Sequence, residues 1–102
     1  MQELIKIEFR IFANLRDILG FKIIFLDILK GSSIREFLHI IGDKYPDGPE
    51  FLRNIIDSEK KKVLTYVKIL IDGRILMGEN ILDTKITKDE SVIAIFPPVG
   101  GG

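Results

Sequence analysis

Residues 4–12 read LIKIEFRIF, and from Ile5 to Ile11 apolar side chains alternate with charged ones. Alternation with this period predicts a strand that buries one face. Residues 13–20 form a short connection, and residues 21–28 form a second strand-like run. We therefore predict a hairpin with a wide, partly helical connection. The buried face of the first strand is expected to carry Ile5, Ile7, Phe9 and Ile11.

A helix is predicted to begin at Ser33, because Glu36 follows three residues later in the pattern of a capping box. The helix is expected to end near Lys44, ahead of Pro46. Apolar side chains recur at helical spacing along one face, at Ile34, Phe37, Leu38 and Ile41. His39 falls on the opposite side, where a solvent-exposed histidine is favoured over a catalytic one.

A shorter helix is predicted to begin near Asp47-Gly48-Pro49, because proline suits the first turn of a helix. Its apolar stripe is assigned to the core and comprises Phe51, Leu52, Ile55 and Ile56. The lysine run at residues 60–62 is interpreted as a solvated turn, with a phosphate site as the alternative.

Three more strands are expected in the last third of the chain. Residues 63–71 are predicted to form one strand, and residues 75–77 its short partner. Between them stand Asp72 and Gly73, the residue types that a type I′ turn requires. Residues 92–96 are mostly apolar, as is typical of a central strand.

The predicted order is strand, strand, helix, short helix, strand, strand, strand. A mixed sheet with one main helix packed on one face is an α+β roll of the ubiquitin-like, β-grasp kind. We expect this β-grasp domain to comprise residues 1–96, and residues 97–102 to form a flexible, reactive tail.

The composition narrows the classes of function. The chain has 102 residues, 15 basic and 15 acidic side chains, and no cysteine. A balanced charge gives no field that favours nucleic acid or an anionic membrane, and the lack of cysteine excludes disulfides and thiolate chemistry. No apolar stretch approaches the roughly 20 residues that span a bilayer, and the N-terminus is not a basic signal region. We therefore expect a cytoplasmic protein of one domain, without a nucleic-acid or membrane partner.

The C-terminal residues are the most informative about function. Phe96 is followed by Pro97 and Pro98, which favour a stiff, extended segment, and then by Val99 and the glycines at residues 100–102. Glycine has no side chain, so such an end can thread a channel that is too narrow for other residues. A carboxylate resists nucleophiles until it is activated, for example as an acyl adenylate. Activation of this end would therefore come from a partner enzyme.

Three stretches of the sequence carry a family resemblance: RIFANLRD at residues 10–17 with Gly20, IDGR at residues 71–74, and ESVIAIFPPVGGG at residues 90–102. The chain resembles the ubiquitin-like sulfur carriers, most closely the molybdopterin synthase small subunit, a group related to ThiS-type proteins and archaeal ubiquitin-like modifiers. The third stretch is the most specific of the three, because it joins a strand, two prolines and a terminal glycine pair.

The resemblance implies a shuttle for sulfur. In such proteins an E1-like enzyme adenylates the terminal glycine, here Gly102, using ATP and magnesium. A sulfur donor protein then converts the adenylate to a thiocarboxylate. The tail, Pro97 to Gly101 with the loaded Gly102, enters the large subunit, where sulfur passes to the molybdopterin precursor. The resemblance therefore implies a non-catalytic subunit of a transferase complex, with no bound cofactor, no metal and no catalytic residue of its own.

The resemblance also implies a partner-binding patch at Phe12, Ile75 and Phe96. Alternation along the strands supports this for two of the three, because Phe12 and Phe96 fall out of phase with the buried positions beside them. Clustered, exposed apolar side chains mark partner sites. The alternative is that Phe12 and Phe96 only cover one another at the end of the sheet.

Two other functions stay open at the level of sequence. The chain could be a protein modifier whose activated Gly102 forms isopeptide bonds with lysines of target proteins. It could also be a β-grasp interaction module whose tail is never activated. Two features depart from the family pattern: Gly100 stands where many relatives have a larger residue, and residues 47–62 form a longer segment than in compact relatives.

Overall fold

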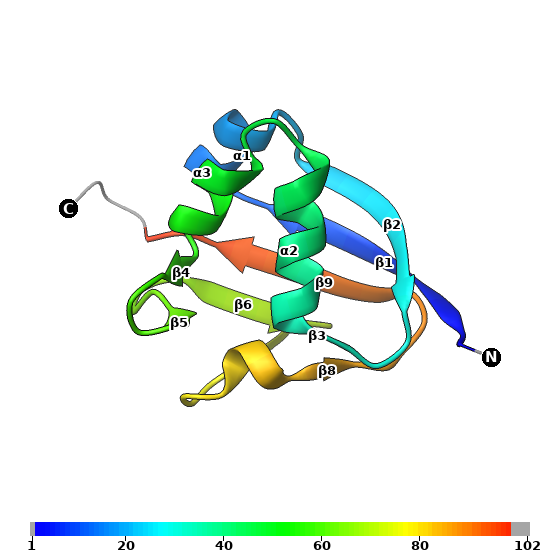
Figure 1. Cartoon of the computed structure of the whole chain (residues 1–102). Coiled ribbons are helices and arrows are strands. Elements are labelled where there is room, and N and C mark those ends of the chain that lie inside the picture. The colour runs from blue at the N-terminus through cyan, green and yellow to red at the C-terminus, as the bar shows by residue number, and fades with distance from the viewer. Residues whose placement is uncertain (1, 99–102) are drawn as a thin grey trace.

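A mixed five-stranded sheet forms one layer of this computed structural model, in which residues 2–98 are described (Figure 1). The strand order is β2-β1-β9-β6-β7, with β1 and β9 parallel and the other neighbours antiparallel. The predicted hairpin and the central position of the last strand are both confirmed. The strand bounds are β1 (Leu4–Ile11), β2 (Ile23–Leu29), β6 (Lys68–Ile71), β7 (Arg74–Ile75) and β9 (Ser91–Phe96).

The helices lie on one side of this sheet, and the longest of them crosses its middle (Figure 1). Their bounds are α1 (Asn14–Leu19), α2 (Ile34–Lys44) and α3 (Gly48–Arg53), followed by the 3₁₀ turn η1 (Ile81–Asp83). Two short antiparallel pairs complete the fold: β3 (Ser32–Ser33) with β8 (Lys85–Ile86), and β4 (Ile56–Asp57) with β5 (Lys62–Val63). The predicted α+β arrangement, with one main helix on one face of a mixed sheet, is therefore confirmed.

Phe9 of β1 joins the sheet to the helices at the centre of the core. Its ring meets those of Phe37 in α2 and Phe51 in α3 edge-on, with centroid distances of 5.0 Å and 6.2 Å. All three side chains are fully buried. Edge-to-face contacts of this kind add about 0.5–1.5 kcal/mol each beyond the burial of the rings. The alternation predicted for β1 is confirmed, because Ile5, Ile7 and Ile11 are buried with Phe9.

The capping box predicted at the start of α2 is present. The Glu36 backbone N–H donates to Ser33 Oγ at 3.1 Å, and the Ser33 backbone N–H donates to Glu36 Oε1 at 2.9 Å. These two bonds satisfy N–H groups that a helix start otherwise leaves without partners. The helix ends at Lys44 as predicted, and His39 is exposed.

Helices α2 and α3 approach one another closely at two glycines. A Cβ atom on Gly48 would lie 1.8 Å from the backbone oxygen of Gly42, and a Cβ atom on Gly42 would lie 2.5 Å from Leu52 Cδ1. Gly48 therefore needs a residue without a side chain, because it faces backbone, whereas a side chain at Gly42 would require Leu52 to shift. The contact holds the short helix α3 against α2, and the predicted stripe on α3 joins the core, with Phe51 and Ile55 fully buried.

The strand predicted over residues 63–71 is wrong in its first half. The chain instead forms β5, then a turn, then β6. In that turn the Leu64 N–H donates to the Ile55 oxygen at 2.8 Å, and the Val67 N–H donates to the Leu64 oxygen at 3.0 Å. The first bond ties the chain to the end of α3 and β4, so this stretch pairs with its own neighbour and not with the main sheet.

The turn predicted at Asp72 and Gly73 is confirmed. Both residues have positive φ, 50° and 83° respectively, as a type I′ turn requires. The Asp72 backbone N–H donates to the oxygen of Val92 in β9 at 2.8 Å, and the Asp72 carboxylate accepts the Val92 N–H at 2.8 Å. The turn is thereby fixed against the central strand, but its second strand, β7, begins at Arg74 and is shorter than predicted.

Candidate functional site

Phe12 and Phe96 form a stacked pair at the end of the two central strands. Phe12 follows β1 directly and Phe96 ends β9. Their ring centroids lie 4.1 Å apart and the ring planes differ by 9°. Both side chains are half-buried, whereas Ile11 and Ile95 beside them in the chain are fully buried on the helix side. The stack therefore lies on the sheet face that the helices leave uncovered.

Arg16 supports this stack from α1. Its guanidinium carbon lies 4.8 Å from the centre of the Phe12 ring, and its Nε donates to the backbone oxygen of Ile11 at 2.7 Å. Because this hydrogen bond fixes the guanidinium over the ring, the cation–π contact orders both side chains. Arg16 was not among the residues predicted for the site, although it stands four residues from Phe12 in the same stretch.

Ile75 lies on the same face of the sheet, on the edge strand β7. Four residues form a row across the sheet, one from each of β7, β6, β9 and β1. In that order they are Ile75, Leu70, Ala94 and Arg10, and each pairs with the next. Side chains that are opposite one another in register share a face. Ile75 is 51% exposed. The three predicted residues therefore share one face, but only Phe12 and Phe96 are in direct contact.

A shallow hollow of about 360 Å³ lies next to the stack on this face. Its lining comes from β1 and its end, β6, the β6–β7 turn and β9, and consists of Arg10, Phe12, Leu70, Asp72, Gly73, Val92, Ala94 and Phe96. The Arg10 guanidinium pairs with the Glu8 carboxylate, so its charge is compensated within the sheet. We call the Phe12–Phe96 stack, this hollow and Ile75 the docking surface.

The tail leaves the domain at the docking surface. Pro97 follows Phe96 and is buried, and Pro98 is exposed. The tail residues that the sequence predicts to thread a channel, Val99, Gly100 and Gly101, lie outside the described residues, as does Gly102. The predicted division of the chain at residue 96 stays a prediction.

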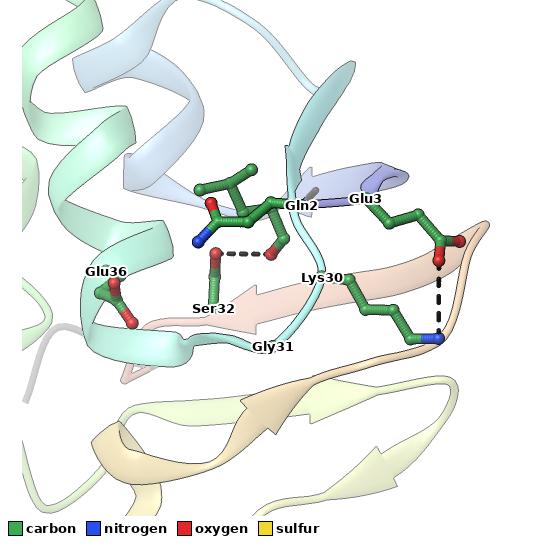
Figure 2. Close-up of a pocket in the computed structure, with 7 residues that line it drawn as sticks. Gln2, Glu3, Lys30, Gly31, Ser32 and Glu36 are labelled. Carbon is green, nitrogen blue, oxygen red and sulfur yellow. Dashed lines mark hydrogen bonds and ion pairs between the residues drawn. The ribbon is translucent and has the colours of Figure 1, made fainter.

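Another hollow lies far from the docking surface. It lies at the opposite end of β1, between the N-terminal residues and the start of α2, and has a volume of about 440 Å³ (Figure 2). Some of its polar groups are already paired: Ser32 Oγ donates to the Leu29 oxygen at 2.6 Å, and Lys30 Nζ lies 3.9 Å from a Glu3 carboxylate oxygen. Glu36 at its edge belongs to the capping box. We find no convergent chemistry in this hollow.

Residues 2–98 contain no cluster of three or more histidine, cysteine or acidic residues that could hold a metal ion. One carboxyl group in this range has a clearly displaced pKa: hydrogen bonds from Ser33 hold the pKa of Glu36 below its ordinary value. That group stabilises a helix start and is far from the docking surface. Within the same residues, no helix is both long and apolar enough to cross a membrane.

Comparison with known proteins identifies the family and similar folds. Residues 9–102 match the model of the ThiS family. The Haloferax volcanii HVO 2177 protein in solution is similar, with 26% identity and a TM-score of 0.77 over 97% of this chain and 88% of that chain. Small archaeal modifier protein 1 from Methanosarcina acetivorans has 27% identity and a TM-score of 0.71 over 98% and 99% of the two chains.

A third similar structure is the protein–protein complex of subunits 1 and 2 of molybdopterin-converting factor from Helicobacter pylori. The matching chain has 23% identity and a TM-score of 0.54, with 96% of this chain and 100% of that chain covered. A likeness at that identity shows the shared fold. No curated protein matches the chain in sequence.

Proposed function

The chain belongs to the ThiS family, and we propose that it is a sulfur carrier that acts as the small subunit of a molybdopterin synthase. Its fold is the ubiquitin-like β-grasp roll. The observation that carries the proposal is the way the chain ends: a central strand, two prolines and three glycines, beginning directly beside an apolar surface. That arrangement delivers a narrow carboxylate end to whatever protein covers the surface.

In the proposed reaction the chain supplies the group that is modified, and partner enzymes supply the catalysis. An E1-like enzyme transfers AMP from ATP, with magnesium, to the Gly102 carboxylate and releases pyrophosphate. Sulfur from a donor protein then displaces AMP and leaves a thiocarboxylate. The glycines carry this group into the active site of a large subunit, which passes the sulfur to the molybdopterin precursor. The chain itself binds no cofactor, and the expected compartment is the cytoplasm.

The docking surface is proposed to hold the partners while the tail is in their active sites. Phe12 and Phe96 present one apolar platform, and Ile75 presents a second apolar side chain two strands away. A few large apolar side chains near the centre of an interface typically carry most of its binding energy. Because the tail starts at Phe96, binding at this surface sets where the tail points.

The direct test is to incubate the chain with an E1-like enzyme, ATP and a sulfur donor, and to measure its intact mass. We expect the mass gain of one oxygen replaced by sulfur, located in the C-terminal peptide. A variant that lacks Gly101 and Gly102 should show no gain and should melt at the same temperature as the full chain. An unmodified full chain, in an assay that modifies a known carrier, would contradict the proposal.

The docking surface provides the second arm of the same test. Ile75→Asp places a charge on the proposed interface, and we expect it to weaken binding to the large subunit by about tenfold or more. Ile40→Asp is the matched control, because Ile40 is 40% exposed on α2, on the other side of the sheet. Equal binding by the two variants would place the interface elsewhere.

A second candidate function is a protein modifier joined to lysines through Gly102. The similarity to small archaeal modifier protein 1, at 27% identity, favours it. Tryptic peptides of protein recovered from its own cells distinguish the two functions. The last tryptic site is Lys88, so a modifier would leave the branch 89–102 on target lysines. A terminal thiocarboxylate without such branches supports the sulfur carrier.

A further inference from the structure

A second concave surface lies on the helix side of the molecule, between α2, α3, the β4–β5 loop and η1. It has a volume of about 340 Å³. Its floor is apolar and consists of Leu52 from α3, Ile56 from β4 and Leu82 from η1. Leu52 and Ile56 are partly buried and pack on the core, and Leu82 is 4% exposed. The floor therefore gives a partner side chain an apolar contact that is already in place.

The rim of this hollow is basic. Arg35 and His39 come from successive turns of α2, Arg53 ends α3, and Lys61 lies in the β4–β5 loop. Arg35 donates to Asp83 Oδ1 at 2.6 Å. Within residues 2–98, neither Arg53 nor Lys61 lies at ion-pair distance from a carboxylate. The rim thus presents two uncompensated cations, one from α3 and one from the β4–β5 loop, beside an apolar floor. We call this concave surface the basic hollow.

The basic hollow is built by the segment that has no part in the proposed sulfur chemistry. The close approach of Gly42 and Gly48 lays Leu52 against α2. The β4–β5 hairpin then brings Ile56 and Lys61 to the same place. This segment falls within residues 47–62, which the family resemblance implies are longer than in compact relatives. A basic-rimmed apolar hollow has the form of a binding element.

We propose that the basic hollow binds a short acidic segment of a partner protein, with an apolar side chain on the floor and flanking carboxylates at Arg53 and Lys61. Because the free charges on the rim are positive, a complementary partner segment carries negative charge. Because Arg53 comes from α3 and Lys61 from the β4–β5 loop, with apolar residues in the same lining, a segment that combines carboxylates with an apolar side chain complements the hollow. The floor has no aromatic ring on which a nucleic-acid base could stack. A concave floor also fits a protruding peptide side chain better than the flat surface of a membrane.

The basic hollow and the docking surface lie on opposite faces of the sheet. The floor residues pack on the helix side, whereas the Phe12–Phe96 stack lies on the face without helices. A partner at one surface therefore leaves the other accessible. An acidic segment held at the basic hollow could join a further protein to the carrier, or extend the contact of a partner that reaches around the domain.

The test uses the full chain and a fluorescein-labelled peptide in which glutamate and leucine alternate. Binding is measured by fluorescence anisotropy, and its place by amide shifts in NMR spectra. We expect saturable binding that shifts the amides of Arg53 and Lys61 and weakens as salt is added, because exposed ion pairs are screened. A peptide with serine in place of leucine, and one with lysine in place of glutamate, should bind at least about tenfold more weakly.

Two charge reversals locate the site. Lys61→Glu should weaken binding by about tenfold, whereas Lys88→Glu makes the same change of charge on an exposed turn outside the hollow and should have little effect. Both lysines are exposed, so neither variant should lose its fold, which the melting temperature checks. No activating enzyme is present, so failure here leaves the proposed sulfur transfer untouched.

The outcomes that overturn the inference are specific. Equal weakening by Lys61→Glu and Lys88→Glu would show attraction to charge alone. Equal binding of the leucine and serine peptides would show that the floor is not used. Absence of peptide binding up to the solubility limit would also overturn it, as would tight, Lys61-dependent binding to vesicles of anionic lipid in place of the peptide.

Discussion

The two neighbouring helices α2 and α3 begin in different ways. At the start of α2, Ser33 and Glu36 exchange two hydrogen bonds, so residues within one turn form a cap that the sequence predicts. A third bond comes from outside this turn, because the Ile34 N–H donates to the Thr84 oxygen at 2.9 Å. At the start of α3, the side chain of Asp47 makes no capping hydrogen bond. The short helix α3 is held by its contact with α2 at Gly42 and Gly48. The start of α2 therefore has a local cap in its sequence, whereas the start of α3 has none and depends on a contact between segments.

That difference also separates the two candidate surfaces. The docking surface depends on the register of the long strands β1 and β9, which alternation along the sequence already indicates. The basic hollow depends on how α3 and the β4–β5 hairpin fold back onto α2. Substitutions at the two helix starts therefore compare a hydrogen-bonded cap in α2 with the contact between α2 and α3. The basic hollow depends on that contact, and the docking surface does not.

The largest effect is expected from Gly48→Ala. The new methyl group would lie 1.8 Å from the Gly42 oxygen, so the backbone of one helix must move. Overpacking of this kind costs about 1–3 kcal/mol and sometimes more, and we expect a loss at or above the upper end. Thermal unfolding should show a decrease of about 10 °C or more. Glu50→Ala, an exposed position in the same helix, is the control.

A melting temperature of Gly48→Ala equal to that of the wild type would show that α3 is not held by this contact. The basic hollow should respond together with the fold, because Leu52 and Arg53 belong to α3. If α3 loosens without global unfolding, peptide binding at the hollow should weaken while the docking surface keeps its affinity.

An intermediate effect is expected from Ser33→Ala at the start of α2. The substitution removes the acceptor of the Glu36 N–H, and loss of such a cap costs about 1 kcal/mol. Asp47→Ala is the matched variant at the start of α3. It removes no hydrogen bond of the side chain to the helix end and should change stability by less than about 0.5 kcal/mol. Urea unfolding measures both.

Equal losses for Ser33→Ala and Asp47→Ala would remove the distinction between the two helix starts. A larger loss for Asp47→Ala would mean that its side chain caps α3 in solution. The expected order follows from the hydrogen bonds alone, because both substitutions shorten a polar side chain to the same methyl group.

The same distinction explains which elements could be predicted from the sequence. Alternation in β1, the capping box of α2 and the turn at Asp72 and Gly73 are local signals, and all three are confirmed. Each needs only residues that are close together in the chain. They also place Phe12 and Phe96 outside the core, because phase along a strand decides the face of every side chain.

The error over residues 63–71 has the opposite origin. Val63 to Val67 is rich in residues that favour strands, yet Leu64 donates to Ile55, and Tyr66 is 74% exposed. Strand propensity depends on context, and here the neighbouring chain segment decides the pairing. One signal for the missed β4–β5 hairpin was available. The Asp57 carboxylate accepts the N–H groups of Glu59 and Lys60, which is a turn that aspartate commonly forms.

The features of the candidate site also divide into those that the sequence shows and those that only the folded structure shows. The prolines, the glycines and the two aromatic residues are visible in the sequence. The row that joins Ile75 to Leu70 and Ala94 is not visible in full, since its second pair depends on pairing between the distant strands β6 and β9. The contact of Arg16 with Phe12 joins residues four apart, but no sequence pattern indicates that the two side chains meet. The type I′ turn does fix the Leu70–Ile75 pair once it is recognised, so half of that row follows from local sequence.

The smallest expected effect is a pH dependence at the start of α2. Hydrogen bonds from Ser33 favour the charged form of Glu36 and hold its pKa below the ordinary value. A carboxyl group whose pKa is lower in the folded state than in the unfolded state stabilises the fold when it is charged. This stabilisation is complete above the unfolded pKa of about 4.3, and it is lost as pH falls through the lowered pKa of the folded state. The folded wild type should therefore lose a small part of its stability in acid.

Glu36→Gln isolates the charge, because the glutamine oxygen can still accept the Ser33 N–H. Urea unfolding of both proteins should show the wild type as the more stable at neutral pH, and the difference should shrink as pH falls through the lowered pKa of Glu36. Glu36→Ala removes the acceptor as well, so it should stay below Glu36→Gln at both neutral and acid pH. A wild-type advantage over Glu36→Gln that does not change with pH would mean that shape, and not charge, makes glutamate the better residue at this helix start.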